Sequence, residues 1–224
     1  MNKVCLIYRD HKLEDWSLER FNRIKQELQK SEIDLFHDFS NDIPNYKIYK
    51  PAVYYQFNPI MNNPEIMTLN FYLKNNSYDY YFHMDNDAHF NGNILDFLKD
   101  LASKDFDFLS SYIYSKEEYY DKYKHENMWI PKPHAFPQNY KIYHAFIPFN
   151  GYSNKYLNFL NNFYGSQGIP AFCEVSLPTL ACNNNFKIFD LAKTNYIDDN
   201  SFAGKAASVD RLNMLYHHVK HRVK

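Results

Sequence analysis

Two aspartates, Asp85 and Asp87, stand one residue apart at the end of a long run of apolar and aromatic residues. In an extended chain, residues i and i+2 point to the same side, so the two carboxylates can converge on one hard divalent cation. Two carboxylates at the end of a buried strand are costly unless a positive charge neutralises them. The alternative is a solvated turn, because Asp and Asn are turn formers and Asn91-Gly92-Asn93 follows closely.

The segments around this acidic turn favour the metal site. The preceding run, Tyr78 to Met84, has the composition of a buried strand, and a helical pattern of apolar residues begins at Asn93. A strand, an acidic turn and a helix in this order are typical of a nucleotide or metal site in an α/β sheet. We therefore expect a divalent cation at Asp85 and Asp87.

The glycines exclude the two common phosphate-binding loops. No two of them have the spacing of GxxxxGK[ST] or GxGxxG. A nucleoside diphosphate would therefore be held by a metal ion and by side chains. The five glycines of the chain are Gly92, Gly151, Gly165, Gly168 and Gly204.

The composition fits one globular domain with a sizeable core, or one domain with a small appendage. The 224 residues are 45% hydrophobic and 23% charged, and the formal net charge of -1 removes the general case for nucleic-acid binding. The apolar run at the amino terminus ends at Tyr8 and is too short for a secretory or membrane-spanning segment. The three cysteines are an odd set without metal-ligand spacing. We therefore expect a cytoplasmic protein with reduced thiols.

Strands and helices are expected to alternate in the first half of the chain, which predicts a mostly parallel α/β sheet flanked by helices. The expected strands are Lys3 to Tyr8, Ile33 to His37, Ala52 to Phe57, Tyr78 to Met84 and Asp107 to Tyr112. The expected helices have their apolar residues at helical spacing, and Asn63-Pro64-Glu65 opens the second of them. The apolar positions are Leu18, Phe21, Ile24 and Leu28 in the first helix, Ile66, Met67, Phe71 and Leu73 in the second, and Ile94, Leu95, Phe97, Leu98 and Leu101 in the third.

The second half begins with a segment of different composition. From Ser115 to Tyr140 the chain is rich in Tyr, Lys, His and Pro without a sustained period, which predicts a functional loop or a lid. A basic tail closes the chain. The elements expected between them are a strand from Tyr143 to Ile147, a helix from Ser153 to Phe163, a loop from Gly165 to Pro170, a short helix with Glu174, and a strand from Phe186 to Leu191.

These features together resemble the GT-A glycosyltransferases, the nucleotide-sugar-dependent transferases with an Asp-x-Asp (DxD) motif. The resemblance rests on the α/β first half, the Asp-x-Asp after a buried strand and a late His near a Lys. Small bacterial enzymes of this fold, which build surface polysaccharide or lipooligosaccharide, carry a carboxy-terminal Tyr-His-Pro-Val-Lys motif. The matching stretch here is Tyr216-His217-His218-Val219-Lys220, in which His218 replaces the Pro and is an alternative ligand to His217.

The resemblance implies roles for the acidic turn and the tail. Asp87 would ligate the metal, Asp85 would contact the metal or the donor ribose, and His217 would complete the protein ligands. Lys220 would pair with the diphosphate, whose negative charge grows as the glycosidic bond breaks. A set of carboxylates and an imidazole suits Mn²⁺ better than Mg²⁺. The basic tail has two other interpretations, a solvated terminus and a patch that touches anionic lipid at a membrane.

The resemblance also implies contacts to the two substrates. Tyr8 and Arg9, at the end of the first strand, would contact the donor nucleotide. Glu174 is similar in position to a carboxylate that serves as base in an inverting reaction, and in a retaining reaction it would only position the acceptor. A favourable interaction with the helix dipole is the other explanation for this Glu. Tyr and His residues of the Ser115 to Tyr140 segment, with Asn150-Gly151-Tyr152, would form the acceptor surface.

Taken with the resemblance, the sequence predicts a single GT-A-like domain over residues 1–224. Residues 1–114 would bind the nucleotide sugar, and residues 115–224 would supply the acceptor site and the metal-binding and phosphate-binding tail. The implied activity is metal-dependent transfer of a sugar from a nucleoside-diphosphate sugar, a UDP-sugar in our hypothesis, to a glycan or lipid-linked acceptor of a bacterial surface polysaccharide.

Three alternatives remain open from the residues. A nucleotidyltransferase shares the sheet and the acidic turn, although it normally has a Gly-rich loop near the first strand, and this chain is Gly-poor there. A non-catalytic carbohydrate-binding protein would use the turn as a calcium site, but such modules are usually all-β and exported. A small interaction domain without a metal is the third.

Overall fold

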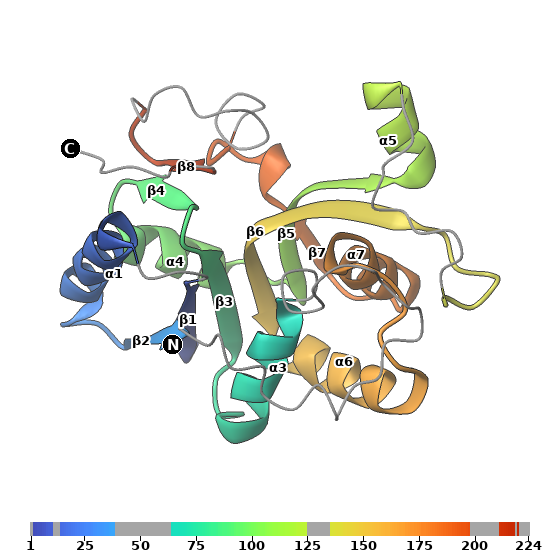
Figure 1. The fold of residues 1–224 in the computed structure, drawn as a ribbon, viewed down its shortest axis with the longest axis horizontal. Helices are drawn as coiled ribbons and strands as arrows, with labels where there is room; N and C mark the ends of the chain where they lie inside the picture. The colour runs from blue at the N-terminus through green and yellow to red at the C-terminus, as the bar shows by residue number, and fades with distance from the viewer. Residues whose placement is uncertain are drawn as a thin grey trace.

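The computed structural model describes residues 2–10, 14–38, 64–124, 135–197, 211–217 and 219. Within these ranges a six-stranded sheet crosses the molecule, and β6 runs antiparallel to the other five strands (Figure 1). This arrangement confirms the predicted mostly parallel α/β sheet. In spatial order the strands are β2 (Ile33–Asp38), β1 (Val4–Arg9), β3 (Tyr80–Asp85), β6 (Tyr143–Ser153), β5 (Phe108–Ser115) and β7 (Ile188–Asp190).

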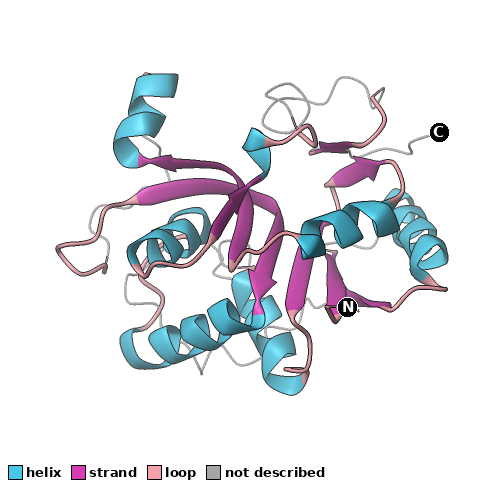
Figure 2. Ribbon diagram, turned by 180° about the vertical axis from the view of Figure 1, so that it is seen from behind, coloured by secondary structure: helices cyan, strands magenta, loops and turns pink. Residues whose placement is uncertain are grey.

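Helices cover both faces of the sheet (Figures 1 and 2). The helices α1 (Asp15–Leu28) and α4 (Ile94–Ser103) pack on one face, and α3 (Glu65–Lys74), α6 (Asn154–Gln167) and α7 (Cys173–Asn183) pack on the other. Neighbouring residues of β1 point to opposite faces, so Leu6 joins the core below α1 and Cys5 joins the other core. The sheet is thereby buried on both sides, as parallel sheets require.

A second, two-stranded sheet lies beyond the end of β3. It pairs β4 (His89–Asn91) with β8 (Met214–Tyr216) in antiparallel register, and His89 stands opposite Tyr216. These strands come from parts of the chain more than a hundred residues apart, and neither was predicted. The small sheet brings the carboxy-terminal segment to the acidic turn (Figure 1).

Most predicted elements of the first half are confirmed, but two helical faces are partly wrong. Leu18 is 43% exposed and Leu73 is 44% exposed, although both were predicted to lie on the apolar faces of their helices. In α1 the buried positions include Ser17 and Arg20, because this side of the helix faces polar groups at the end of β3. The predicted strand from Ala52 to Phe57 and the capping Asn63 lie outside the described residues.

The segment after Ser115 is not a loop throughout. A helix, α5 (Lys116–Tyr123), follows Ser115, whose side chain accepts a hydrogen bond from the Glu118 amide, while the Glu118 carboxylate accepts one from the Ser115 amide. This reciprocal capping box is a sequence signal that the composition had obscured. Residues 125–134 lie outside the described residues.

The later elements are longer or shorter than predicted. The strand β6 continues to Ser153, and α6 continues to Gln167 and so includes Gly165. The helix with Glu174, α7, is 11 residues long, while β7 has only three residues. A short 3₁₀ helix, η1 (Leu191–Lys193), follows β7. No helix among the described residues has both the length and the apolar character needed to cross a membrane.

Candidate nucleotide and metal site

The acidic turn stands at the carboxyl end of β3, in the middle of the sheet. Asp85 is the last residue of the strand and pairs in register with Arg9, the last residue of β1. The Ala88 amide then donates to the Asp85 carbonyl at 2.9 Å, which closes a turn before β4. The Asp85 and Asp87 side chains are 18% and 15% exposed. Two carboxylates that are this far buried need positive or hydrogen-bonding partners.

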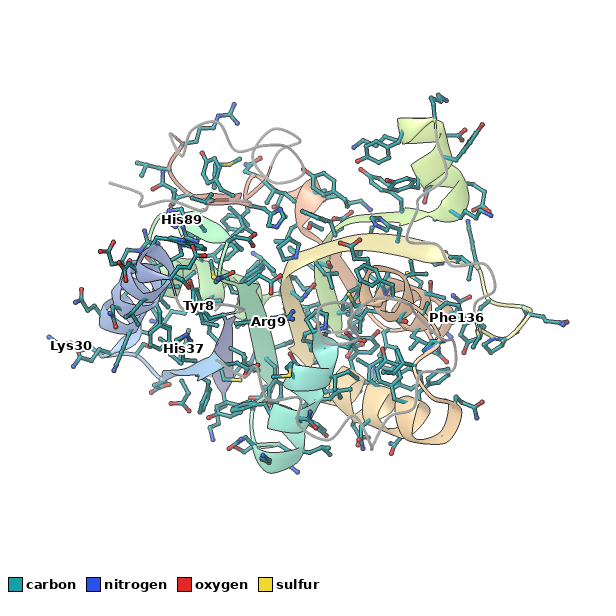
Figure 3. All side chains as sticks on the ribbon, viewed as in Figure 1. Tyr8, Arg9, Lys30, His37, His89 and Phe136 are labelled. Carbon is teal, nitrogen blue, oxygen red and sulfur yellow. The ribbon has the colours of Figure 1, made fainter. Side chains whose placement is uncertain are left out.

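Asp85 has its partners within the sheet. Arg9 is labelled in Figure 3, near the middle of the sheet. Its Nη1 lies 3.6 Å from Asp85 Oδ1, and its side chain is only 5% exposed. His83 Nε2, two residues earlier on the same face of β3, lies 3.4 Å from the same oxygen. The buried guanidinium thus neutralises the carboxylate at the base of the site, so Arg9 acts on the site through Asp85.

Asp87 faces the carboxy-terminal segment instead. His217 Nε2 lies 3.5 Å from Asp87 Oδ1, and the Val219 amide donates to the Asp87 carbonyl at 3.0 Å. The pairing of β4 with β8 brings His217 close to Asp87, because His217 follows Tyr216, the last residue of β8, and so lies beside the acidic turn. The His217 ring also packs edge-on against Phe146 of β6, with ring centroids 4.8 Å apart.

Arg20 of α1 connects the acidic turn with the carboxy-terminal segment that carries His217. Its Nη1 donates to the carbonyls of Asn86 and Ala88, the latter at 3.5 Å. Its Nη2 donates to the Val219 carbonyl at 2.9 Å. Burial lowers the pKa of Arg20 from its ordinary value, and the charge of nearby Asp87 acts in the opposite direction. One buried guanidinium therefore fixes both the acidic turn and the segment that carries His217.

A buried hydrogen-bond network supports the turn from below. Asn86 Nδ2 donates to Asp10 Oδ1 at 2.7 Å, and Ser17 Oγ donates to Asp10 Oδ2 at 2.6 Å. The Tyr8 hydroxyl donates to the Asn86 carbonyl at 3.3 Å. Burial raises the pKa of Tyr8 to about 12, so the hydroxyl stays protonated. Tyr8 is fully buried and supports the turn from within the core, and its predicted contact with the donor nucleotide stays a prediction.

Glu174 lies in the first turn of α7, near the start of β6. His144 Nε2 is 3.4 Å from Glu174 Oε2, and the two side chains are 8% and 12% exposed. His144 stands two residues before Phe146, the residue that contacts His217. The strand β6 therefore connects Glu174 to the Asp87 and His217 pair through His144 and Phe146.

Asp87 and His217 fit as part of a metal-ligand set. Their separation of 3.5 Å is long for a hydrogen bond but lies within the span of about 4 Å between two donor atoms on one ion. In the part of the chain that the structure describes, no group of three or more His, Cys, Asp or Glu side chains is placed to hold a metal. His218 and Lys220 lie outside that part. A cation here would take its remaining ligands from substrate oxygens and water, as Mg²⁺ often does.

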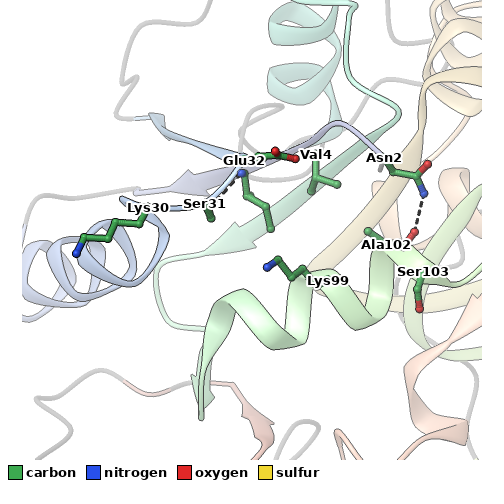
Figure 4. Close-up of a pocket in the computed structure, with 9 residues that line it drawn as sticks. Asn2, Val4, Lys30, Ser31, Glu32, Lys99, Ala102 and Ser103 are labelled. Carbon is green, nitrogen blue, oxygen red and sulfur yellow. Dashed lines mark hydrogen bonds between the residues drawn. The ribbon is translucent and has the colours of Figure 1, made fainter.

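A cavity elsewhere in the fold is separate from this site. It has a volume of about 620 Å³ and lies at the opposite end of β1 from Arg9, with Lys30, Glu32 and Lys99 in its lining (Figure 4). Ligands of open α/β sheets bind at the carboxyl ends of the strands, and this cavity is at the amino ends.

Comparisons with known proteins identify the fold. No protein-family model and no curated protein matches the chain. A solved structure, a glycosyltransferase involved in the glycosylation of the major capsid of PBCV-1, superimposes with a TM-score of 0.51 at 11% identity, over 98% of this chain and 96% of that chain. The chain has a GT-A-like fold. The galactosyltransferase LgtC, solved with donor and acceptor sugar analogues, is also similar, with a TM-score of 0.46, 14% identity and coverage of 96% of this chain and 87% of that chain.

Within this GT-A-like fold, sequence reasoning missed three residues of the site. His83 had a local signal, because it lies two residues before Asp85 and strand alternation puts both on one side. Arg20 had none, since its partners are 66 and 199 residues away along the chain. His144 had none either, because its partner Glu174 belongs to a different element.

Proposed function

We propose that the chain is a glycosyltransferase that uses a nucleoside-diphosphate sugar, with Mn²⁺ or Mg²⁺ at Asp87 and His217. The approach of these two side chains at the carboxyl end of β3, in a GT-A-like fold, carries the proposal. A carboxylate oxygen and an imidazole nitrogen are suitable ligands for Mn²⁺. The carboxyl ends of parallel strands are also where α/β sheets bind nucleotides.

Each side chain of the site has a role in this proposal. When bound, the cation would supply positive charge to the diphosphate that leaves as the glycosidic bond breaks. Asp87 and His217 would hold the ion, while Asp85, already neutralised by Arg9, would contact the ion or the donor ribose. Lys220 lies outside the described residues, and in this proposal it keeps the role that the resemblance implies, which is to pair with the diphosphate.

The remaining parts of the proposal concern the substrates. We take a UDP-sugar as donor and a glycan or lipid-linked acceptor of a surface polysaccharide, on the strength of the carboxy-terminal residues Tyr216 to Lys220. Glu174 would bind the acceptor. A peripheral contact of the basic tail with a membrane is a prediction of the same kind.

Thermal unfolding with ligands tests the proposal. The native protein would be heated with UDP, GDP, CDP and their sugars, each with and without Mn²⁺, beside Asp87→Asn and the control Asp96→Asn on the exposed side of α4. We expect one nucleotide to raise the midpoint by about 5–10 °C when present near 100 times its Kd, only with Mn²⁺. The rise should persist in Asp96→Asn and disappear in Asp87→Asn.

The opposite result is equally clear. If no nucleotide shifts the unfolding midpoint while Ca²⁺ or free glycans do, the proposal of a transferase is wrong. The alternative of a carbohydrate-binding protein with a calcium site is then favoured.

A further inference from the structure

The carboxy-terminal segment enters the fold at Asn213, the residue directly before β8. Leu212 is 77% exposed and Met214 is buried, so the chain passes from the surface into the fold between these two residues. Asn213 makes this turn with a φ angle of 59°, in the left-handed region. Asn tolerates that region better than most residues, whereas a β-branched side chain is strained there. The type of residue at position 213 therefore affects how the segment enters β8.

The turn places Asn213 against β4 and the glycine that follows it. The Asn213 amide donates to the Asn91 carbonyl at 2.6 Å, and Asn91 Nδ2 donates to the Arg211 carbonyl at 3.0 Å. A Cβ atom at Gly92 would lie 2.6 Å from Asn213 Oδ1 and 2.8 Å from Cε1 of Phe90. The Phe90 ring is 2% exposed in the core, so it has no room to move away. A side chain at position 92 would therefore push the carboxy-terminal segment away from β4.

The two short strands specify their register only weakly by themselves. Each has three residues, and a shift of one residue would turn every side chain of β8 to the opposite face. Such a shift would also remove His217, which follows β8, from its place 3.5 Å from Asp87. Leu215 opposes the shift from within the core, and the contacts of Asn213 oppose it where the strand begins.

We propose that Asn213, seated against Gly92, is a positioning residue of the proposed metal site. Its left-handed turn sets the register of β8 and so places His217 beside Asp87. This inference rests on the proposed function for what the Asp87 and His217 pair binds. The position of His217 itself can be measured without a ligand, because its ring meets the Phe146 ring edge-on, with centroids 4.8 Å apart.

NMR spectroscopy of the protein alone tests the position of His217. The probe is the nuclear Overhauser effect between the ring protons of His217 and Phe146. We expect this effect in the native protein and in Asn213→Gly, because glycine adopts a left-handed turn without strain. It should fall fivefold or more in Asn213→Val, because a β-branched residue is strained in that conformation.

Two glycine substitutions provide a matched comparison. Gly92→Ala should weaken the Overhauser effect as Asn213→Val does, since the added methyl group meets Asn213. Gly165→Ala is the control, because a Cβ atom at Gly165 in α6 meets no other atom of the described residues within 4 Å. Undiminished effects in both Asn213→Val and Gly92→Ala would overturn the proposal. An equal loss in Asn213→Gly and Asn213→Val would overturn it too.

A second measurement connects the position of His217 with cation binding. The Mn²⁺ dependence of the nucleotide-induced rise in unfolding midpoint gives an apparent Kd for Mn²⁺. We expect this Kd to be at least tenfold higher in Asn213→Val and Gly92→Ala, and unchanged in Asn213→Gly and Gly165→Ala. An unchanged Kd in variants that have lost the Overhauser effect would also overturn the proposal. A native protein that shows the Overhauser effect but no nucleotide response would instead contradict the transferase itself.

Discussion

At the scale of single residues, Asp85 and Asp87 have different partners although only one residue separates them. Asp85 is held by a guanidinium that is always charged, and Asp87 is held by an imidazole that is neutral or charged. A cation can take the place of a proton on His217, but it cannot replace Arg9. We therefore propose that Asp87 is the main metal ligand, and that Asp85, beside its contact with the ion or the ribose, stabilises the fold through Arg9.

This division predicts different effects of the same substitution. Asp85→Asn leaves the buried Arg9 without its carboxylate and should lower the free energy of unfolding by about 2–4 kcal/mol. Asp87→Asn keeps a side-chain oxygen beside His217 and should change that free energy by less than about 1 kcal/mol. Urea unfolding of both variants measures the difference. Equal losses of stability in the two variants would contradict the assignment.

Arg20 provides a second test at this scale. Arg20→Met removes donors from the carbonyls of Asn86, Ala88 and Val219, all of which stay buried or nearly so. We expect a loss of about 2–4 kcal/mol in the free energy of unfolding, together with loss of the nucleotide response. Lys25→Met, which removes an exposed cation from the same helix, is the control and should leave both unchanged. An Arg20→Met protein that still responds to nucleotide and Mn²⁺ would show that the anchoring is unnecessary.

At the scale of elements, the short pair of strands β4 and β8 positions His217. Leu215 of β8 is fully buried in the core that contains Phe90 and Phe97, so packing holds the carboxy-terminal segment in place. Three-residue strands contribute few hydrogen bonds, and this apolar anchor must supply most of the stability of the pairing.

Two leucines of the same segment make a matched comparison. Leu215→Ala should reduce the free energy of unfolding by about 2–4 kcal/mol and weaken the nucleotide response, because it leaves a cavity beneath β8. Leu212→Ala, at a position 77% exposed, should do neither. Chemical unfolding and the ligand-induced shift in the unfolding midpoint measure both effects. Similar behaviour of the two variants would mean that β8 does not hold the site together.

The same elements indicate which parts of the structure were predictable. The strand β3 and the helix after Asn93 follow from local signals, namely an apolar run and an Asn that caps the amides of Leu95 and Asp96. The capping box at Ser115 would have predicted α5 in the same way. The pairing of β4 with β8 could not be predicted, since each strand is too short for a pattern and their register is a tertiary contact. The approach of His217 to Asp87 is implied by the resemblance of the tail to a family motif and by no local signal in the sequence.

At the scale of the whole molecule, the site stands above a core that contains a buried carboxylic acid. Glu65, in the first turn of α3, is fully buried and accepts a hydrogen bond from the Tyr164 hydroxyl at 3.2 Å. Burial raises the pKa of Glu65 from 4.5 to about 8, and Arg9 at the base of the site acts in the opposite direction. The core on the α3 side is therefore most stable when this group is protonated.

The pH dependence follows from this shift. The folded protein keeps the Glu65 proton up to about pH 8, whereas the unfolded chain loses it near pH 4.5. The folded state binds more protons between these values, so this group makes stability fall as pH rises through that range, by about 3–5 kcal/mol at most. Glu65→Gln has no carboxyl proton to lose in this range. In urea unfolding at pH 5, 6.5 and 8, the free energy of unfolding of the native protein should therefore fall relative to that of the variant. Parallel stabilities at the three pH values would contradict a protonated Glu65.

The most direct test of the transferase is cleavage of the donor. Release of nucleoside diphosphate would be measured from UDP-glucose, UDP-galactose, UDP-N-acetylglucosamine and GDP-mannose, with the methyl glycosides of glucose, galactose and mannose as acceptors. We predict that the native protein cleaves one donor with Mn²⁺, that EDTA stops the reaction, and that Asp87→Asn reduces the rate at least 100-fold while Asp96→Asn does not. Intact donors under all conditions, or cleavage that continues in Asp87→Asn with EDTA, would contradict a metal-dependent glycosyltransferase site at the end of β3.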